Sequence, residues 1–256
     1  MFEEMPYNYV SNKDSIMVSV NNQTQKLKGE ARKKLLKYYE LRKQRGMSLL
    51  EVIIVLGIVG TIAAGVVVLA QRAFDARAIT EVVTNTNTVR VAMKDAYQRD
   101  GVYPSYVSPT TLTADTIKTD TSGIVAAQLV QLGKISPDEA RNNISGDFFG
   151  IGAATVGGGA GGATLPNKGY VIEVNGLSSE QCRAIISQVG NNWDYVQVGT
   201  SASGQYSLTA TAVDMTASAT GDVLRSLNTN GNATIDSSAT LDTCTASVNS
   251  IILGSR

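Results

Sequence analysis

"RGMSLLEVIIVLGIVGTIAAGVVVLAQRAF", residues 45–74, decides the fold of the N-terminal third of this chain. Between positions 49 and 70 only Glu51 and Thr61 interrupt apolar or glycine residues, and residues 52–70 alone form a run of 19. At about 1.5 Å per residue, an α-helix of that length spans the roughly 30 Å hydrocarbon core of a bilayer. The stretch therefore predicts a helix that can cross a membrane.

Positive charge is concentrated directly before this stretch. Between Met17 and Gly46 nine lysines and arginines face two glutamates, although the 22 basic and 22 acidic residues of the whole chain cancel. A basic segment before an apolar one holds a leader on the cytoplasmic side of a membrane. Residues 1–16 are mildly acidic and differ in character from the basic segment, so Met17 is hypothesised to be the true start. A nucleic-acid-binding tail is the alternative interpretation of the basic block.

The helical pattern continues beyond the apolar stretch. Along residues 72–97 apolar side chains recur with spacings of three and four, as in a helix with one buried face, and no proline interrupts them. Gly101 suits a C-terminal cap, and Pro104 forbids continuation of the helix. We therefore predict one helix from about residue 48 to residue 98, apolar all round in its first half and one-sided in its second.

The rest of the chain predicts a globular head with an antiparallel sheet. Segments rich in Thr, Val, Ser and Ile are interpreted as strands, at 168–177, 194–200, 205–214, 232–241 and 245–254. The fold class is thus α+β, with the distal half of the long helix packed against the sheet.

Two short helices and one loop are predicted within this head. Residues 177–190 begin with Ser178 and Gln181 in capping-box positions, and residues 135–142 carry a similar start signal. The glycine-rich stretch 150–166 predicts a flexible loop. It lacks the Gly-Lys-Ser/Thr ending of a phosphate-binding loop, so we expect no nucleotide cofactor there.

The chain contains two cysteines, Cys182 and Cys244, which limits the disulfides and metal sites that it can form. Two thiols are too few for a structural zinc site, and in an exported domain an even pair is typical of one disulfide. Closing a loop of about 60 residues would stabilise the domain by about 4 kcal/mol in the chain-entropy model. Two reduced, buried cysteines are the alternative.

The absence of histidine removes many enzyme classes. Without a single histidine in the chain, triads, general bases and metal sites that depend on imidazole are excluded. The adjacent acids Asp138 and Glu139 fit helix-start charges better than a catalytic pair. We expect no catalytic residue, no cofactor and no metal site.

Three interpretations compete for the N-terminal third. A secretory signal cut after Ala70 would release a soluble domain, but the apolar stretch exceeds the usual length and runs on as a helix. A plain signal anchor explains the length and the basic flank, yet leaves Glu51 unexplained, because a carboxylate at membrane depth costs at least a few kcal/mol without a partner. Snorkelling of Glu51 to the membrane interface is the simplest structural explanation. The third interpretation is a prepilin.

The run "RG-MSLLEVIIVLGIVGTIAAG" resembles the type IV prepilin signature. The resemblance implies that prepilin peptidase cuts after Gly46, that Met47 becomes the N-methylated mature N-terminus, and that Glu51 is the fifth mature residue. A long leader and a first methionine resemble the type IVb class. Together with the late segment "NGLSSEQC", the run is similar to the longus and colonisation-factor pilins of enterotoxigenic bacteria.

That resemblance implies a type IV pilin fold and a division of the chain into three parts. Residues 1–46 would be the leader, residues 47–98 the N-terminal helix with the filament core at 49–70, and residues 99–256 the head with a disulfide-bounded region at 182–244. Cleavage after Gly46 would create an amine four residues from Glu51, and pairing of the two charges would fix the axial register of packed helices.

The implied function is that of the major subunit of a surface fibre used for host-cell adherence and bacterial aggregation. Head-to-tail contacts that do not close generate a helical homopolymer. The implied partners are further copies of the chain, prepilin peptidase, the inner-membrane pilus assembly machinery, a minor pilin and a host-cell surface receptor, with no nucleic acid. The precursor would lie in the inner membrane and the fibre outside the cell. A minor pilin, a type II secretion pseudopilin and a membrane-anchored monomeric binding domain are the alternatives.

Overall fold

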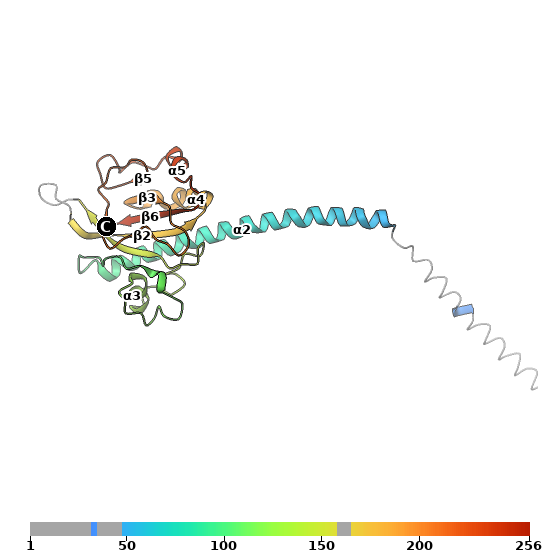
Figure 1. Ribbon diagram of the computed structural model, residues 1–256, viewed down its shortest axis with the longest axis horizontal. Helices are drawn as coiled ribbons and strands as arrows, with labels where there is room; N and C mark the ends of the chain where they lie inside the picture. The colour runs from blue at the N-terminus through green and yellow to red at the C-terminus, as the bar shows by residue number, and fades with distance from the viewer. Residues whose placement is uncertain (1–31, 35–47, 158–164) are drawn as a thin grey trace, which may run out of the picture. The chain divides into compact units, whose positions relative to one another are not determined.

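The computed structural model describes residues 32–34, 48–157 and 165–256 (Figure 1). The chain divides into two compact units after Val66. The boundary falls inside helix α2 (Leu49–Tyr97), a single helix of 49 residues. The first unit thus ends in the apolar turns of α2, whereas the second holds the remaining turns of α2 and the head. The predicted helix bounds are confirmed to within one residue at each end.

The two halves of α2 differ in burial, as their patterns predict. Every residue from 49 to 69 is exposed. One side of the second half is buried in the head, through Ile79, Val82, Thr86, Val89, Ala92 and Met93. The helix ends where Gly101, at φ +63°, donates its N–H to the carbonyl of Tyr97 at 3.1 Å. This left-handed conformation is open to glycine, which confirms the predicted cap.

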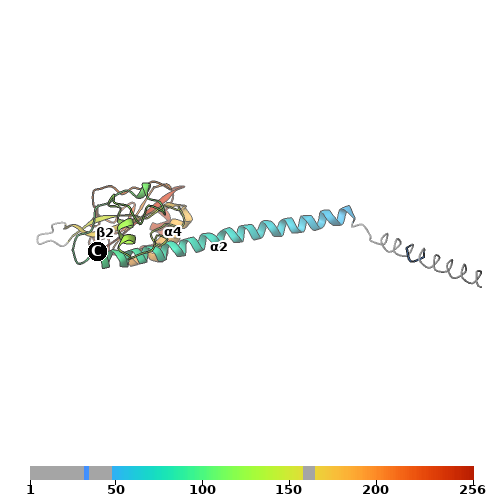
Figure 2. The ribbon, with the colours of Figure 1, turned by 90° about the horizontal axis from the view of Figure 1, so that it is seen from below.

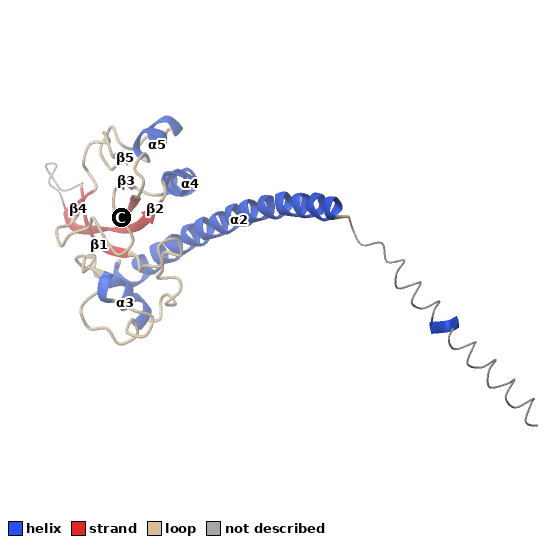
Figure 3. Ribbon diagram, turned by 45° about the vertical axis from the view of Figure 1, so that its right-hand side comes forward, coloured by secondary structure: helices blue, strands red, loops and turns tan. Residues whose placement is uncertain are grey.

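The head contains one six-stranded sheet in the order β4-β1-β2-β6-β3-β5 (Figures 1 and 3). Its strands are β1 (Gly150–Val156), β2 (Leu165–Leu177), β3 (Tyr195–Gly199), β4 (Val213–Asp214), β5 (Val223–Arg225) and β6 (Asn249–Ser255). Neighbouring strands are antiparallel except β1 and the two-residue β4, which are parallel. The α+β class is confirmed, and the predicted antiparallel sheet is corrected to a mixed one.

Short helices complete the head. They are α3 (Val125–Gln131), α4 (Ser179–Val189) and α5 (Ser237–Thr243), with 3₁₀ turns at Pro109–Thr111 and Gly190–Asn192. The capping box predicted for α4 is present, because Ser178 Oγ accepts from Gln181 N at 3.2 Å and Gln181 Oε1 accepts from Ser178 N at 3.0 Å. The predicted helix at 135–142 was wrong. Its start signal forms only a turn, since Arg141 pairs with Phe148 in a β-bridge.

Two predicted strands were also wrong. Residues 205–214 form a strand only at β4, because the backbone N–H groups of Ser207 and Leu208 donate to the Glu173 carboxylate instead of to a neighbouring strand. Residues 232–241 lead into α5, whose first turn closes when Thr240 N donates to the carbonyl of Asp236 at 3.2 Å. The strands predicted at 168–177, 194–200 and 245–254 are confirmed as β2, β3 and β6.

The predicted loop at 150–166 was wrong at both ends, because residues 165 and 166 begin strand β2 and residues 150–156 form strand β1. Tyr106 crosses this strand so closely that a Cβ atom at Gly152 would lie 2.6 Å from Tyr106 Cβ. Glycine at this position therefore reflects close packing rather than a flexible chain. Residues 158–164 of the predicted loop lie outside the described residues.

Alternate residues of β2 enter two hydrophobic clusters. Tyr170, Ile172 and Val174 join the larger cluster with the distal half of α2, and Val171 joins a smaller one with Met215. The distal turns of α2 are thus fixed to one side of the sheet within the second unit (Figure 2). Tyr170 Oη reinforces the contact by donating to the carbonyl of Arg90 at 3.0 Å.

Candidate assembly site

The first half of α2 presents a continuous apolar surface. Its large side chains have exposed fractions from 37% at Val52 to 79% at Leu49, and no residue from 49 to 69 is buried. By length and composition this helix can cross a membrane. An apolar surface of this extent is characteristic of contact with lipid or with another protein.

Three glycines interrupt this surface, although no close neighbour in the described chain requires a glycine at these positions. Apart from neighbouring residues of the same helix, no atom of the described residues lies within 4 Å of a Cβ atom added at Gly57, Gly60 or Gly65. Each glycine weakens a helix interior by about 1 kcal/mol relative to alanine. Small residues of this kind let two helices approach closely, so the glycines fit contacts with a second helix.

Glu51 is the only charged residue between positions 49 and 70, and it lies in the first turn of α2. Within the described ranges its carboxylate makes no hydrogen bond or ion pair. By contrast, the hydroxyl of Thr61 donates to the carbonyl of Ile58 at 2.8 Å, so the other polar side chain of the stretch is satisfied internally. Gly46 and Met47, the two expected processing residues, lie outside the described residues.

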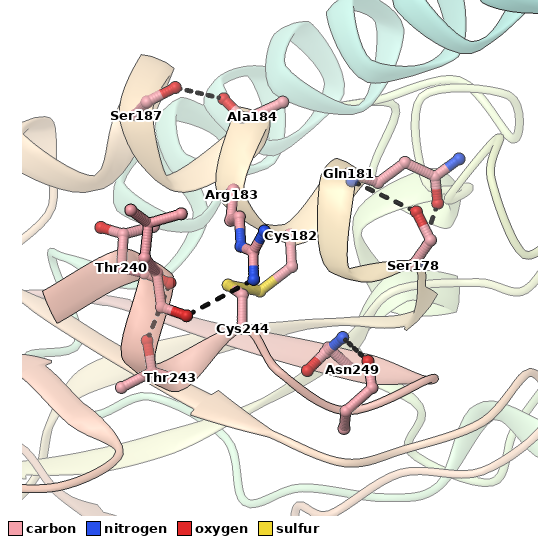
Figure 4. The surroundings of a disulfide bond; sticks show 12 residues. Ser178, Gln181, Cys182, Arg183, Ala184, Ser187, Thr240, Thr243, Cys244 and Asn249 are labelled. Atoms are coloured by element: carbon pink, nitrogen blue, oxygen red, sulfur yellow. Dashed lines mark hydrogen bonds between the residues drawn. A yellow bond between two sulfur atoms is a disulfide. The ribbon is translucent and has the colours of Figure 1, made fainter. Parts of the chain in front are cut away.

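Cys182 and Cys244 form the disulfide that the sequence predicted, with their Cα atoms 5.9 Å apart (Figure 4). Cys182 lies in α4, and Cys244 is the residue that directly follows α5. Both cysteines are fully buried. Because 62 positions separate them, the bond ties the C-terminal third of the head to α4.

The head contains a buried polar cluster that no sequence pattern predicted. Glu173, with no exposed surface, accepts from Ser207 Oγ at 2.7 Å and from the N–H groups of Ser207 and Leu208 at 2.9 to 3.0 Å. Nearby, Asp147 accepts from Asn175 Nδ2 at 2.9 Å. These partners lie about 30 positions apart in the chain, so no local pattern signals them.

One exposed ion pair, Lys134–Asp95, and one hydrogen bond, from Asn143 to Glu81, add to the attachment of α2 to the head. Lys134 Nζ lies 2.6 Å from Asp95 Oδ2, and this hydrogen bond lowers the pKa of Asp95. Glu81 Oε1 accepts from Arg77 Nε of the same helix at 2.8 Å, and Glu81 Oε2 accepts from Asn143 Nδ2 at 2.8 Å. These hydrogen bonds lower the pKa of Glu81. Both carboxylates are therefore held in the charged form that their cationic neighbours favour.

The expected helix-start acids have a structural role. Glu139 Oε2 accepts from Ser136 N at 2.7 Å, and this backbone hydrogen bond lowers the pKa of Glu139. Asp138 provides a backbone carbonyl to Asn85 at 3.3 Å. Across the described part of the chain no group of three metal-binding side chains occurs.

Comparison with known proteins gives two family matches in separate parts of the chain. Residues 128–248 match the family of the toxin-coregulated pilus subunit TcpA, and residues 41–67 match the prokaryotic N-terminal methylation motif. The second match contains Gly46, Met47 and Glu51.

Curated relatives and a solved structure agree with these matches. Toxin coregulated pilin of Vibrio cholerae serotype O1 is 39% identical over 155 residues, and a second Vibrio cholerae toxin coregulated pilin is 41% identical over the same length. Each alignment covers 60% of this chain and 62% of the relative. The crystal structure of TcpA, a type IV pilin from Vibrio cholerae El Tor, matches with a TM-score of 0.52 and 25% identity over 70% of this chain and 99% of that one. The resemblance to type IVb pilins is thus confirmed as homology to the toxin-coregulated pilins.

Proposed function

We propose that this chain, a homologue of the toxin-coregulated pilins, is the structural major subunit of a type IVb pilus. The observation that carries the proposal is the first half of α2, an exposed apolar helix whose glycines have room for a Cβ atom and no neighbour in the described chain beyond their own helix. A surface of this kind is covered by lipid before assembly and by equivalent helices in a fibre. The subunit's work in such a fibre is structural and requires no catalysis.

Processing would prepare the helix for assembly. The N-terminal methylation match at 41–67 supports cleavage by prepilin peptidase after Gly46 and methylation of the new N-terminus at Met47. The basic residues 1–46 would then be a removed leader, leaving residues 47–98 as the helical stem and residues 99–256 as the head.

Glu51 would set the register of the fibre. Its carboxylate has no partner within the described residues, and the amine created at Met47 would lie four residues away on the same side of the helix. An unpaired carboxylate would oppose packing in the dry interior of a helix bundle, whereas a charge pair is compatible with one axial position. The expected gain is specificity of assembly.

The place and partners of the subunit follow from this function. The precursor would lie in the inner membrane, where the pilus assembly machinery extracts it, and the fibre would extend from the cell surface. Repeated copies of the chain are the main partner, with a minor pilin at initiation and a host-cell receptor at the surface.

The proposal is tested by N-terminal sequencing and intact-mass measurement on material sheared from cells. We expect an abundant chain that begins at Met47 and carries one methyl group, and Gly46→Leu should leave full-length precursor without fibres. A chain cut after Ala70, or an uncleaved monomer, would contradict the proposal. Processed chain at only a few copies per cell would instead identify a minor pilin or pseudopilin.

A further inference from the structure

A pocket of about 510 Å³ lies between α4 and α5, beside the disulfide. Its lining combines apolar side chains with hydroxyl and amide groups, including Ile186, Ile235, Leu241, Asn191 and Ser237. This volume lies within the range of about 300 to 1,000 Å³ that is typical of small-molecule sites. The pocket is therefore large enough for a small ligand.

Arg183 is the only charged residue that lines this pocket among the residues that the structure describes. Within the same residues no carboxylate lies within 4.0 Å of its guanidinium. The Nε atom is buried without a hydrogen-bond partner, and Nη2 makes only a long bond of 3.4 Å to the carbonyl of Leu241. Figure 4 shows this side chain reaching from α4 toward α5 beside the disulfide. A guanidinium with unused donors favours a carboxylate, which can accept two parallel hydrogen bonds.

The pocket walls are fixed before any ligand arrives. The disulfide joins α4 to the end of α5, and Asn191 Oδ1 accepts from Ile235 N at 2.9 Å, which holds the segment before α5. The Nδ2 group of Asn191 has no partner among the described residues and remains free to donate. Walls held in this way reduce the ordering cost of binding.

We propose that this pocket binds a carboxylate-bearing monosaccharide. Arg183 pairs with the carboxylate, Asn191 and Ser237 bond the ring hydroxyls, and the more accessible Ile235 and Leu241 cover the apolar face of the ring. The combination of one cation with neutral polar and apolar groups fits an acidic sugar better than a neutral or cationic one. This proposal rests on the proposed function in one respect only, namely that the sugar belongs to a host-cell glycan.

Binding is tested on the detergent-solubilised full chain by ligand-observed NMR titration. The probe is N-acetylneuraminic acid, and its methyl ester provides the same ring without the charge. We expect the ester to bind at least tenfold more weakly than the acid. Equal affinity of the two compounds, or no binding of either, would overturn the proposal. Equal affinity of N-acetyl-aspartate would overturn the assignment to a saccharide, because that compound carries carboxylates without a ring.

Two pairs of variants locate the site. Arg183→Met should weaken binding of the acid tenfold to a hundredfold, as for a lost charge-assisted hydrogen bond, while Lys118→Met removes an exposed cation elsewhere and should change nothing. Ser187→Glu places a carboxylate four residues from Arg183 on the same face of α4 and should block the acid. Gln188→Glu adds the same charge on the next residue, which does not line the pocket, and should leave binding unchanged. Unchanged binding in Ser187→Glu, at wild-type thermal stability, would overturn the site.

The yield of sheared fibres is measured for bacteria that express the same variants. Fibres without sugar binding overturn the pocket assignment and leave the proposed function intact. Binding by a chain that never forms fibres overturns the proposed function and leaves the pocket intact.

Discussion

Ser207 Oγ donates a 2.7 Å hydrogen bond to Glu173 Oε1, a carboxylate that is fully buried in the head. The two residues are 34 positions apart. The same carboxylate also accepts from the backbone N–H groups of Ser207 and Leu208, so these contacts attach the connection between β3 and β4 to strand β2. A buried charge is tolerated only when donors satisfy it. The connection therefore holds its conformation through one side chain rather than through a strand ladder.

Glu173→Gln should destabilise the head by about 2 to 3 kcal/mol, because the amide nitrogen would face N–H donors and lose charge-assisted bonds. Thermal unfolding of the detergent-solubilised full chain measures the effect. Asp222→Asn, which removes an exposed carboxylate with no side-chain hydrogen bond among the described residues, is the matched control. An unfolding temperature equal to that of the control would contradict the structural role of Glu173.

Gly60→Leu should impair fibre assembly and leave the head stable, whereas Gly152→Ala should destabilise the head. Beyond the neighbouring residues of α2 itself, no atom of the described chain lies within 4 Å of a Cβ added at Gly60, so the leucine variant should keep wild-type head stability and lose fibre yield through blocked helix contacts. The alanine at position 152 would meet Tyr106 Cβ at 2.6 Å and should lower head stability by about 1 to 3 kcal/mol. Protease resistance and sheared-fibre yield distinguish the two. Normal fibre yield from Gly60→Leu would argue against a tight helix contact there.

Glu51→Val should yield a folded, inserted and processed subunit that polymerises poorly, because the new N-terminal amine would lack its partner. Thr61→Val is the control within the same apolar stretch, since the Thr61 hydroxyl is already bonded to the carbonyl of Ile58 and should be dispensable. Fibre yield is measured by shearing, with processing followed on a gel. If both variants assembled equally well, the charge-pair argument would be lost.

Cys182→Ser combined with Cys244→Ser should lower the stability of the head by about 4 kcal/mol, the chain-entropy value for a loop of this length. The double variant avoids an unpaired thiol. Its unfolding midpoint in denaturant should fall to that of the wild-type chain measured under reducing conditions, and fibre yield should fall with it. Unchanged resistance to protease would show that the bond does not support the fold.

Asp95→Asn should reduce the acid sensitivity of the head. The hydrogen bond from Lys134 lowers the pKa of Asp95 below its ordinary value of 3.8, so the folded state gains stability above pH 3.8 and loses it as the pH falls through the lowered folded-state pKa. The variant should thus be slightly less stable at pH 7 and lose less on acidification. Thermal unfolding from pH 7 to pH 2 tests this, with the exposed Asp115→Asn as control. Parallel profiles for wild type and Asp95→Asn would contradict the prediction.

Local signals were sufficient for features that depend on neighbouring residues. The change from an all-round to a one-sided apolar pattern located both halves of α2, and Ser178 with Gln181 located the start of α4. The segment at 135–142 carried a comparable signal, yet it forms a turn because the bridge between Arg141 and Phe148 ends it. Similarly, the glycines of β1 suggested a loop, although the close approach of Tyr106 is what requires glycine at position 152.

The sequence by itself determined the long helix, the isolated acid within it, the methylation motif and the number of cysteines, because each is a matter of composition or of spacing along a few turns. Only the tertiary structure decided which strands pair, that Glu173 holds residues 207 and 208, and that Arg183 lines a pocket between α4 and α5. These features join residues tens of positions apart. Their energies depend on distance and burial in space, which spacing along the chain does not encode.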